Sequence, residues 1–377
     1  MSPARPPRGS APPGGEARSA RGALVTVGSV EFVDAGVGVS IQDAGRSGHR
    51  AIGVPLAGAA DPVLLACANA LLAQAGDTAA LEIALVGPTL RAHDAPLQLA
   101  LAGDFAPCLT LADGTTTALA SWRSVTLAPG EVFAAGPCRS GIGYLAIAGG
   151  CDVPRVLGSR STYARAALGG IDGRAPRAGD RLPVRAAPGP ERRAPRPFAH
   201  ADGPLRVLGG PQDDHFDAAQ FERFVSTDWR VSREADRMGL RLEGPALAHH
   251  PDRGADIVSE GVVPGAVQVP GAGLPIVLGV DAQTIGGYAK IATAIRADVP
   301  RLAHARPGAV LRFRAVTRGE ALAARRDAAA TFADWLRRIE PLHGRSGEAI
   351  DAALRASNLI SGMIDAAPAA ADTLPWE

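Results

Sequence analysis

The sequence predicts a mainly β protein made of two related β units, with short helices and a helical extension towards the C-terminus. Its 377 residues are too many for one compact core and suggest about two domains. From residue 79 to 184, short apolar runs alternate with Gly, Pro and Asp at hairpin spacing. This spacing favours a sandwich or a closed barrel over alternating strand and helix units. Residues 205–317 repeat the order of turn, buried strand, turn and closing strand, as a duplicated β unit would.

The predicted boundaries follow changes in composition along the chain. They are a disordered tail at 1–22, a first β domain at 23–185, a linker at 186–204, a second β domain at 205–317, a helical extension at 318–365 and a disordered tail at 366–377. Both the N-terminal tail and the linker are dense in Pro and Arg and lack an apolar period, which is typical of segments without a core of their own.

Helices are expected at few places. Asp61-Pro62 predicts a helix start, with Asp as the N-cap and Pro at the first helical position, and Gly76 predicts the end of that helix. Thr317 and Glu320 form a capping-box pattern that opens the extension. The remaining expected helices are a short aromatic one around 216–224, one at 288–297 and an amphipathic one at 350–364.

Composition excludes several classes of protein. The net charge is only +1, so the sequence lacks the basic footprint of a nucleic-acid-binding protein. Its longest apolar runs are the length of a strand, and no hydrophobic segment follows the N-terminal arginines, so we expect neither a membrane span nor a secretory signal. Four widely spaced cysteines indicate free thiols in a reducing compartment. We therefore expect a cytoplasmic protein without nucleic-acid or membrane partners.

Lys290 is the only lysine in the chain, and every other strongly basic side chain is an arginine. A lysine is a compact charge that can lose its proton when buried, whereas arginine is a planar fork that stays charged. We expect Gly286-Gly287 to form a turn that opens the helix at 288–297, with Lys290 near its first turn, where backbone N–H groups and the helix dipole favour an anion. The alternative is a lysine on a solvated helix face.

Common catalytic and nucleotide-binding motifs are missing from the sequence. It contains no dinucleotide-binding glycine fingerprint, no phosphate-binding Gly-Lys-Ser/Thr loop, no Gly-x-Ser-x-Gly elbow and no Cys-x-x-Cys. His249-His250 with His215 could suggest a metal site, but adjacent histidines point in two directions from one backbone. We interpret them as surface histidines and expect no metal.

Polar clusters between the β runs are the remaining candidates for a site. Glu82 is notable because a carboxylate inside an apolar strand must be paired or neutral. The clusters combine arginine and amide donors with a few carboxylates, which suits a small substrate bearing carboxylate and amide groups. The candidate residues are Gln42, Asp43, Arg46, Glu82, Arg160, Ser161, Thr162, Arg237, Gln268, Asp281, Gln283, Thr284, Tyr288 and Lys290.

The order of these motifs resembles the biotin-dependent carboxyltransferase family. Its members include the C subunit of 5-oxoprolinase (the KipI-antagonist type), allophanate hydrolase subunit 2 and the matching domain of urea carboxylase. The resemblance spans residues 24 to about 316. It is carried by Ile41-Gln-Asp-Ala-Gly-Arg46, Gly53-Val-Pro55, Leu81-Glu-Ile83, Gly158-Ser-Arg-Ser-Thr-Tyr163, Gly210-Pro-Gln212, Arg237-Met-Gly239, the stretch from Asp281 to Lys290, and Arg306-Pro-Gly308.

The resemblance implies two cyclophilin-like barrel domains in one chain of a multi-subunit, ATP-dependent 5-oxoprolinase. That enzyme is an amide (lactam) hydrolase in which ATP acts through the complex with the A subunit and the KipI-like B subunit. Lys290, Arg46 and Arg160 would then hold the substrate carboxylate or an acyl-phosphate-like anion, and Asp43 or Asp281 would manage the amide proton. The orienting residues would be Gln42, Gln268, Gln283 and Thr284. Two alternatives stay open: a carboxyltransferase that uses biotin and acts on urea or another small amide, and a regulatory partner-binding protein.

Overall fold

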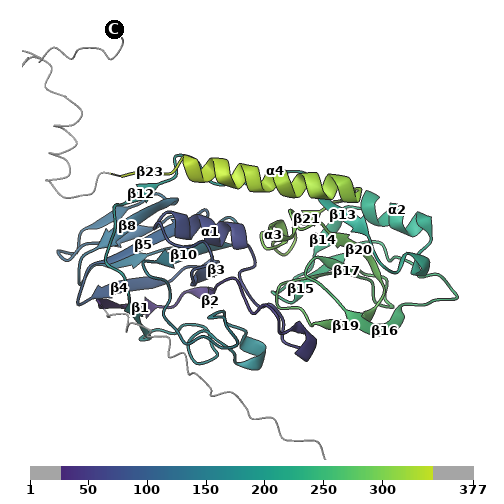
Figure 1. Cartoon of the computed structure of the whole chain (residues 1–377), viewed down its shortest axis with the longest axis horizontal. Coiled ribbons are helices and arrows are strands. Elements are labelled where there is room, and N and C mark those ends of the chain that lie inside the picture. Colours follow the sequence, from purple (N-terminus) through teal and green to yellow (C-terminus); the bar gives the residue numbers. More distant parts are fainter. Residues whose placement is uncertain (1–26, 343–377) are drawn as a thin grey trace, which may run out of the picture.

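The structure is a computed structural model that describes residues 27–342. Within this range the protein is mainly β, as predicted, with few helices (Figure 1). The expected tails at 1–22 and 366–377 and the expected helix at 350–364 lie outside the described residues. No helix in the described part combines the length and the apolar character that a bilayer crossing requires.

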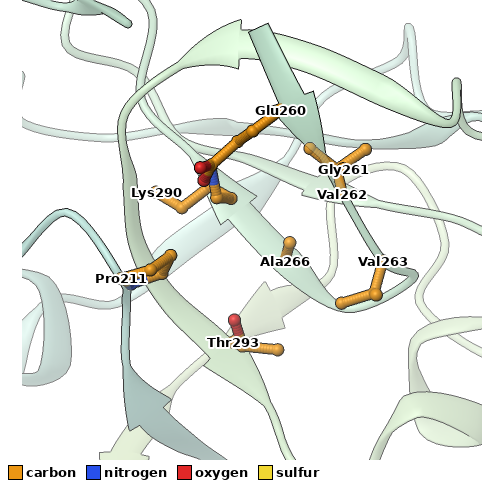
Figure 2. A pocket seen from close by; sticks show the side chains of 8 residues that line it. All are labelled: Pro211, Glu260, Gly261, Val262, Val263, Ala266, Lys290 and Thr293. Carbon is orange, nitrogen blue, oxygen red and sulfur yellow. The ribbon is translucent and has the colours of Figure 1, made fainter. Parts of the chain in front are cut away.

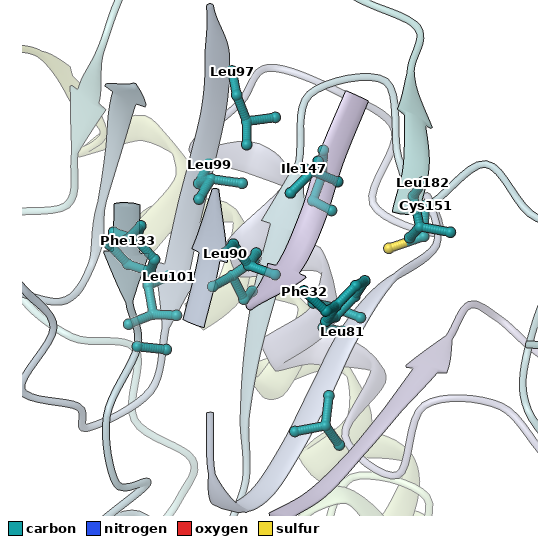
Figure 3. Close-up of a cluster of buried hydrophobic side chains, with 14 of the residues drawn as sticks. Phe32, Leu81, Leu90, Leu97, Leu99, Leu101, Phe133, Ile147, Cys151 and Leu182 are labelled. Carbon is teal, nitrogen blue, oxygen red and sulfur yellow. The ribbon is translucent and has the colours of Figure 1, made fainter. Parts of the chain in front are cut away.

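The first β region consists of two sheets that enclose one core. The six-stranded sheet has the order β11-β1-β4-β9-β6-β7, and the seven-stranded sheet has the order β2-β3-β10-β5-β8-β12-β23. Apolar side chains of both sheets meet between them, as Figure 3 shows, and Cys151 from the loop after β10 packs against them. The strands are β1 (Gly28–Asp34), β2 (Val37–Gln42), β3 (Ala80–Val86), β4 (Thr89–His93), β5 (Leu97–Ala102), β6 (Cys108–Thr110), β7 (Thr116–Ala118), β8 (Arg123–Leu127), β9 (Val132–Ala134), β10 (Gly143–Ile147), β11 (Arg181–Val184), β12 (Arg192–Arg193) and β23 (Glu340–Pro341).

Helix α1 (Pro62–Ala70) covers the outer face of the seven-stranded sheet. It begins where the sequence predicts, because the Asp61 carboxylate accepts hydrogen bonds from Val63 N and Leu64 N. Small residues of the sheet, such as Ala100 and Ala146, let the helix approach closely. All six residues of β5 are therefore buried: Leu97, Leu99 and Leu101 in the core between the sheets, and Ala100 and Ala102 under the helix. Gln98, on the same face as the two alanines, bonds to Gly189.

The second β region is one eight-stranded sheet that curls into a nearly closed barrel. Its order is β21-β14-β15-β18-β17-β20-β13-β22, and only Arg312 separates the two edge strands β21 and β22 along the chain. The two edges must therefore lie close together, and the apolar residues around Trp229, Val267 and Ala292 fill the interior. The strands are β13 (Leu205–Gly209), β14 (Trp229–Val231), β15 (Gly239–Glu243), β17 (Ala266–Gln268), β18 (Ile276–Leu278), β20 (Lys290–Ala294), β21 (Val310–Leu311) and β22 (Phe313–Ala315).

The helix expected at 288–297 is wrong. These residues belong to β19 (Ile285–Tyr288) and β20, which are strands. β19 pairs with β16 (Asp256–Gly261) in a two-stranded ribbon, so Gly286 and Gly287 lie within a strand and do not form a turn. β20 lies between β13 and β17, and the hydrogen bonds and burial on both sides of it outweigh its moderate helix propensity. Lys290 is thus on an inner strand of the sheet and not in the first turn of a helix.

Two short helices and one long helix complete the second half. α2 (Ala218–Ser226) carries Phe221 and Phe224 of the predicted aromatic helix, whereas Phe216 precedes it in an extended conformation. α3 (Val299–Leu302) follows β20. α4 (Arg318–Arg337) starts with the predicted capping box, because the Thr317 and Glu320 side chains each bond to the other's backbone N–H. Figure 1 shows α4 running from the second β region to the first, where Trp335 packs against Trp122.

The segment 186–204, expected as a linker, makes specific contacts with the first β region. Its strand β12 joins the seven-stranded sheet between β8 and β23. Glu191 accepts hydrogen bonds from Thr126 N at 2.7 Å and from the Arg123 guanidinium at 3.0 Å. Phe198 packs edge-on against Phe332 and Trp335 of α4. The segment therefore lies along the seven-stranded sheet and leads to the second β region.

Candidate functional site

Polar side chains of the two β regions meet around Arg237, in the turn between β14 and β15. Its guanidinium contacts both oxygens of Asp281 at 2.9 Å, donates to the Gly58 carbonyl at 2.7 Å and forms an ion pair with Glu82. Burial disfavours the charge, but the Glu82 and Asp281 carboxylates outweigh that effect and raise the Arg237 pKa. Arg237 therefore joins the sheet that carries Glu82 to the loop that carries Asp281.

Glu82 is paired, as a carboxylate inside an apolar strand must be. It lies directly opposite Tyr144 on β10, whose hydroxyl donates to Glu82 Oε2 at 2.5 Å. The same oxygen accepts a hydrogen bond from Ala60 N at 2.9 Å. Burial and the neighbouring Glu82 charge raise the pKa of Tyr144, so this phenol stays a donor. The network reaches α1, because Asp61 N donates to the Tyr144 oxygen at 3.0 Å.

The Asp43 carboxylate is held by four donors in a loop beside this network. They are the hydroxyls of Ser159 and Ser161 at 2.5 and 2.6 Å and the backbone N–H groups of Arg160 and Gly45 at 2.6 and 2.8 Å. Burial alone would raise the pKa of Asp43, but the hydrogen bonds outweigh it and hold the pKa below its ordinary value. Asp43 is therefore a fixed anion near neutral pH.

Arg46 is fully buried next to this loop and is only partly satisfied. One of its nitrogens donates to the Ser161 carbonyl, while Nε and Nη1 have no partner in the described chain. Burial lowers the Arg46 pKa, and the nearby charges of Asp43 and Asp281 act against that shift. Buried donors in proteins almost always have a partner, so two unpaired nitrogens of one guanidinium need a ligand or water.

A separate cavity of about 310 Å³ opens on the second β region (Figure 2). Lys290, only 3 % exposed, extends into it, and its Nζ lies 2.6 Å from Glu260 Oε1. Apart from this ion pair, Nζ has no hydrogen-bond partner within residues 27–342. Lys290 and the Gln212 amide, 2.8 Å from Glu260, lower the Glu260 pKa. The cavity is lined by Pro211, Glu260, Gly261, Val262, Val263, Ala266, Lys290 and Thr293.

Strand register explains why these side chains share one face. On β17 and β20, Val267 pairs with Ala292 but Gln268 pairs with Lys290, which leaves Ile291 without an opposite residue. Such a bulge resets the alternation of side chains, so Lys290 and Thr293 both face the cavity although they are three residues apart. Gln268, opposite Lys290, is buried, and its Nε2 lacks a partner among the described residues.

The structure divides the predicted site residues between these two places. Glu82, Arg237 and Asp281 form one network, with Gln42, Asp43, Arg46, Ser161 and Thr162 gathered beside it. Gln268, Gln283 and Lys290 lie in or next to the cavity region, where Gln283 Nε2 is 3.4 Å from Gln268 Oε1. No contact in the described part of the chain joins Lys290 to Asp43, Arg46 or Arg160.

Three predicted residues are placed less favourably for substrate contact. The Arg160 guanidinium turns away from Asp43 and binds Asp152 and the Val153 carbonyl, both at 2.8 Å. Tyr288, 42 % exposed, is on the β16–β19 ribbon. Thr284 is buried, and its carbonyl accepts the hydrogen bond of Val262 N.

Sequence reasoning missed Glu260, Tyr144, His200 and His304 as polar partners of the site. Glu260 is an acidic residue on an exposed ribbon, and nothing in the linear sequence brings it to Lys290, 30 positions away. Tyr144 lies in an apolar run that is typical of a core strand. Asp61 is predicted as a helix cap, but its second oxygen also contacts two histidines from distant segments.

A family model described as "Carboxyltransferase domain, subdomain A and B" matches residues 52–315. The chain belongs to this carboxyltransferase family. The match covers the Arg237 network and the cavity, so the residues that form them lie within the family's own domain. It confirms the resemblance that the motif order predicts.

Members of this carboxyltransferase family in two bacteria resemble the chain over nearly their whole length. The chain is 37 % identical over 306 residues to the C subunit of 5-oxoprolinase from Escherichia coli, covering 79 % of this chain and 94 % of that protein. It is 34 % identical over 317 residues to the C subunit of 5-oxoprolinase from Haemophilus influenzae, covering 82 % and 98 %. The alignment thus extends from one end of these relatives almost to the other.

Larger members of the family contain the same unit as a part. Urea amidolyase of Saccharomyces cerevisiae is 30 % identical over 310 residues, which cover 76 % of this chain but 16 % of that protein. The crystal structure of the urea amidolyase of K. lactis superposes with a TM-score of 0.73 at 26 % identity, over 81 % of this chain and 20 % of that one. The fold is therefore shared by proteins of different size.

Proposed function

We propose that this chain is the C subunit of a 5-oxoprolinase, a complex that opens the lactam of 5-oxoproline to give glutamate. The observation that carries the proposal is the reciprocal coverage of the bacterial relatives that bear this name, 79 % of this chain against 94 % of the E. coli protein. Urea amidolyase, by contrast, matches through 16 % of its length. The chain thus corresponds in extent to a separate subunit of an amide hydrolase.

We assign ATP use to the assembled complex with the A subunit and the KipI-like B subunit. The sequence has no phosphate-binding loop, so the nucleotide would be held with help from another chain. We also propose a cytoplasmic location, because Cys67, Cys108, Cys138 and Cys151 are all free thiols. The nearly closed barrel supports a cyclophilin-like relationship for the second β region.

We assign the substrate carboxylate to Lys290. The cavity of about 310 Å³ is at the small end of ligand pockets and suits a compact metabolite. Lys290 supplies a positive charge and Gln268 an unpaired amide N–H on the adjoining strand, within the described part of the chain. In the present structure the Lys290 ammonium is paired with Glu260. The Glu260 side chain is 46 % exposed, so an incoming carboxylate can replace Glu260 at the ammonium.

Lactam opening also needs a group that moves the proton of the attacking water or of the amide. In the cavity this group is Glu260, which is ionised near neutral pH and becomes a free acceptor once the substrate carboxylate takes over Lys290. The sequence-based candidates Asp43 and Asp281 belong to the network around Arg46 and Arg237. Asp281 is the better base of the two, because burial raises its pKa despite the opposing Arg237 charge, whereas the Asp43 pKa is lowered.

The decisive experiment reconstitutes the full complex. The chain is combined with the A and B subunits of the same organism, and glutamate release from 5-oxoproline is measured with and without ATP. We expect ATP-dependent release that requires all three chains. Lys290→Met should lower kcat/KM by about 30- to 4000-fold, the equivalent of roughly 2–5 kcal/mol for losing the partner of a desolvated charge.

The matched control is Arg241→Met, which removes an exposed ion pair with Glu234 on the same β region. It should leave kcat/KM within about twofold, because such surface pairs contribute little. Equal rates for wild type and Lys290→Met would refute the assignment of Lys290, and an absence of glutamate release from the complete complex would refute the proposed function itself.

A biotin-dependent carboxyltransferase acting on urea or another small amide is the second candidate. It is favoured by the family description and by 30 % identity to urea amidolyase. Biotin would have to arrive on another chain, because carrier proteins bear it on a lysine and this chain's single lysine is 3 % exposed. Inhibition of turnover by avidin would identify this activity. Tight binding to the B subunit without turnover of any substrate would instead identify a regulatory partner-binding protein.

A further inference from the structure

Three side chains that commonly bind metals converge beside the start of α1, away from the Lys290 cavity. They are Asp61, His200 and His304, and one ligand atom of each lies within 4.8 Å of the others. His200 Nε2 is 2.6 Å and His304 Nε2 is 2.8 Å from the same oxygen, Asp61 Oδ2. The sequence gives no hint of this group, because its members are up to 243 positions apart.

Asp61 is held rigidly in the orientation that presents Oδ2. Its other oxygen, Oδ1, accepts hydrogen bonds from Val63 N and Leu64 N, both at 3.0 Å, as the N-cap of α1. Its backbone N–H donates to the Tyr144 hydroxyl oxygen at 3.0 Å, and the residue is completely buried. Hydrogen bonds of this kind hold the coordinating residues of a metal site in the right orientation and raise the affinity of the site for the metal.

The surroundings of His304 require a cation between its ring and Asp61. Its Nδ1 lies 2.7 Å from the Ser140 carbonyl, which can only accept, so Nδ1 carries a hydrogen. In a neutral ring Nε2 then carries a lone pair, and at 2.8 Å it would face a carboxylate oxygen that also has only lone pairs. A proton or a metal ion must lie there. A histidine that donates one ring N–H to a backbone carbonyl while the other nitrogen faces a cation is typical of metal sites.

We propose that Asp61, His200 and His304 bind a divalent transition-metal ion of the zinc class. Two imidazole nitrogens and one carboxylate oxygen form a suitable ligand set for such ions. The two histidine side chains are 18 % and 26 % exposed, so water can enter as a fourth ligand. A tetrahedral ion would hold its ligand atoms roughly 3.3 Å apart, so the present contacts would lengthen by about half an ångström.

Such an ion would connect three separate segments of the protein. Asp61 is at the start of α1, His200 is in the segment 186–204, and His304 follows α3 in the second β region. A bound ion would therefore cross-link the first and second β regions, and its binding free energy would add to the stability of the folded chain.

The test uses the untagged full-length chain, stripped with EDTA and titrated with Co²⁺ and with Zn²⁺. We expect one equivalent of Co²⁺ with the visible absorption of a nitrogen- and oxygen-ligated site, without a thiolate-to-cobalt band, and displacement by Zn²⁺. His304→Gln and His200→Gln keep an amide that can donate to Asp61 but remove the imidazole. Each should weaken Co²⁺ binding by more than about 100-fold, since even the loss of a supporting contact costs about 10- to 100-fold.

His249→Gln is the matched control, because His249 Nε2 bonds the Val269 carbonyl away from the cluster. It should bind Co²⁺ like the wild type. Circular dichroism checks that each variant is folded, and the use of two ligand variants keeps the test valid if one is not. No binding of Co²⁺ or Zn²⁺ to the wild type, or equal binding by wild type and both ligand variants, would show that a proton alone bridges His304 and Asp61.

Discussion

The ammonium of Lys290 and the carboxylate of Glu260 are partners in the present structure, yet they should have opposite effects on substrate binding. Lys290→Met removes the charge that attracts an anion and should raise KM. Glu260→Gln removes the competing anion, so KM should stay the same or fall. If Glu260 is the proton acceptor, kcat of Glu260→Gln should fall by about 100- to 10,000-fold.

Steady-state kinetics of the reconstituted complex separate these effects. Asp281→Asn is the comparison for the other carboxylate candidate, because Asp281 binds Arg237 and does not line the cavity. A large fall in kcat for Asp281→Asn together with normal kcat for Glu260→Gln would move the proton-transfer role to the Arg237 network.

Asp43 should make the stability of the protein depend on pH. Its folded-state pKa is below the unfolded value of about 3.9, so its stabilising effect is complete above that value and disappears as the pH falls through the folded-state pKa. Asp43→Asn should lower the free energy of unfolding by about 2–3 kcal/mol at pH 7, because the four donors lose a charged acceptor.

Urea denaturation at a series of pH values from 7 to about 3 measures this difference. It should shrink towards low pH, where the wild-type carboxylate is protonated as well. Asp34→Asn is the control, since Asp34 accepts a single exposed backbone hydrogen bond from Gly36. A difference for Asp43→Asn that stays constant with pH would contradict the explanation.

At the scale of elements, the close approach between β20 and the chain that follows β13 requires a glycine at position 210. A Cβ at Gly210 would fall on the carbonyl group of Lys290, and Gly210 N donates to the Ile291 carbonyl at 2.9 Å. The neighbouring Gly209 has no atom within 4 Å of where its Cβ would be. We expect Gly210→Ala to displace Lys290 and to destabilise the protein by about 1–3 kcal/mol, whereas Gly209→Ala should be tolerated.

Thermal denaturation and KM for 5-oxoproline test this pair of variants together. Gly210→Ala should lower the melting temperature and raise KM, because the strand that carries Lys290 must shift. Similar melting temperatures for the two alanine variants would show that β20 does not depend on this close contact.

At the scale of the whole molecule, Arg237 is a largely buried polar connection between the two β regions. Replacing it with Met leaves Glu82 and Asp281 without their countercharge. Breaking a buried ion pair costs about 3–5 kcal/mol, and the partial exposure of Arg237 puts the expected loss near 3 kcal/mol. Calorimetry should then show two separated unfolding transitions, since the β regions have separate cores.

Arg312→Met is the control for this experiment, because it removes an equally bidentate but exposed pair with Asp228. Its cost should be below about 1 kcal/mol. A loss of the same size for both arginine variants would mean that burial of the Arg237 network adds nothing to the joining of the two regions.

Local signals predict the elements that depend on neighbouring residues. Asp61-Pro62 begins α1 and the Thr317–Glu320 box begins α4, because a cap and its N–H partners lie within three residues. The helix predicted at 288–297 is wrong, since nothing local shows that β13 and β17 pair with Lys290–Ala294. The Gly286-Gly287 pair, expected as a turn, lies in a strand because β16 supplies its hydrogen-bond partners.

The mainly β class, the starts of α1 and α4, the family and the types of polar residue at the site can all be predicted from the amino-acid sequence. These follow from composition, short-range periodicity and ordered motifs. Three contacts become visible only in the folded chain: the pairing of Glu260 with Lys290, the joining of Glu82 to Asp281 by Arg237, and the sharing of one Asp61 oxygen by two distant histidines. Hydrogen bonds and ion pairs depend on distances of about 3 Å, and between remote segments such distances arise only when strands pair and loops pack.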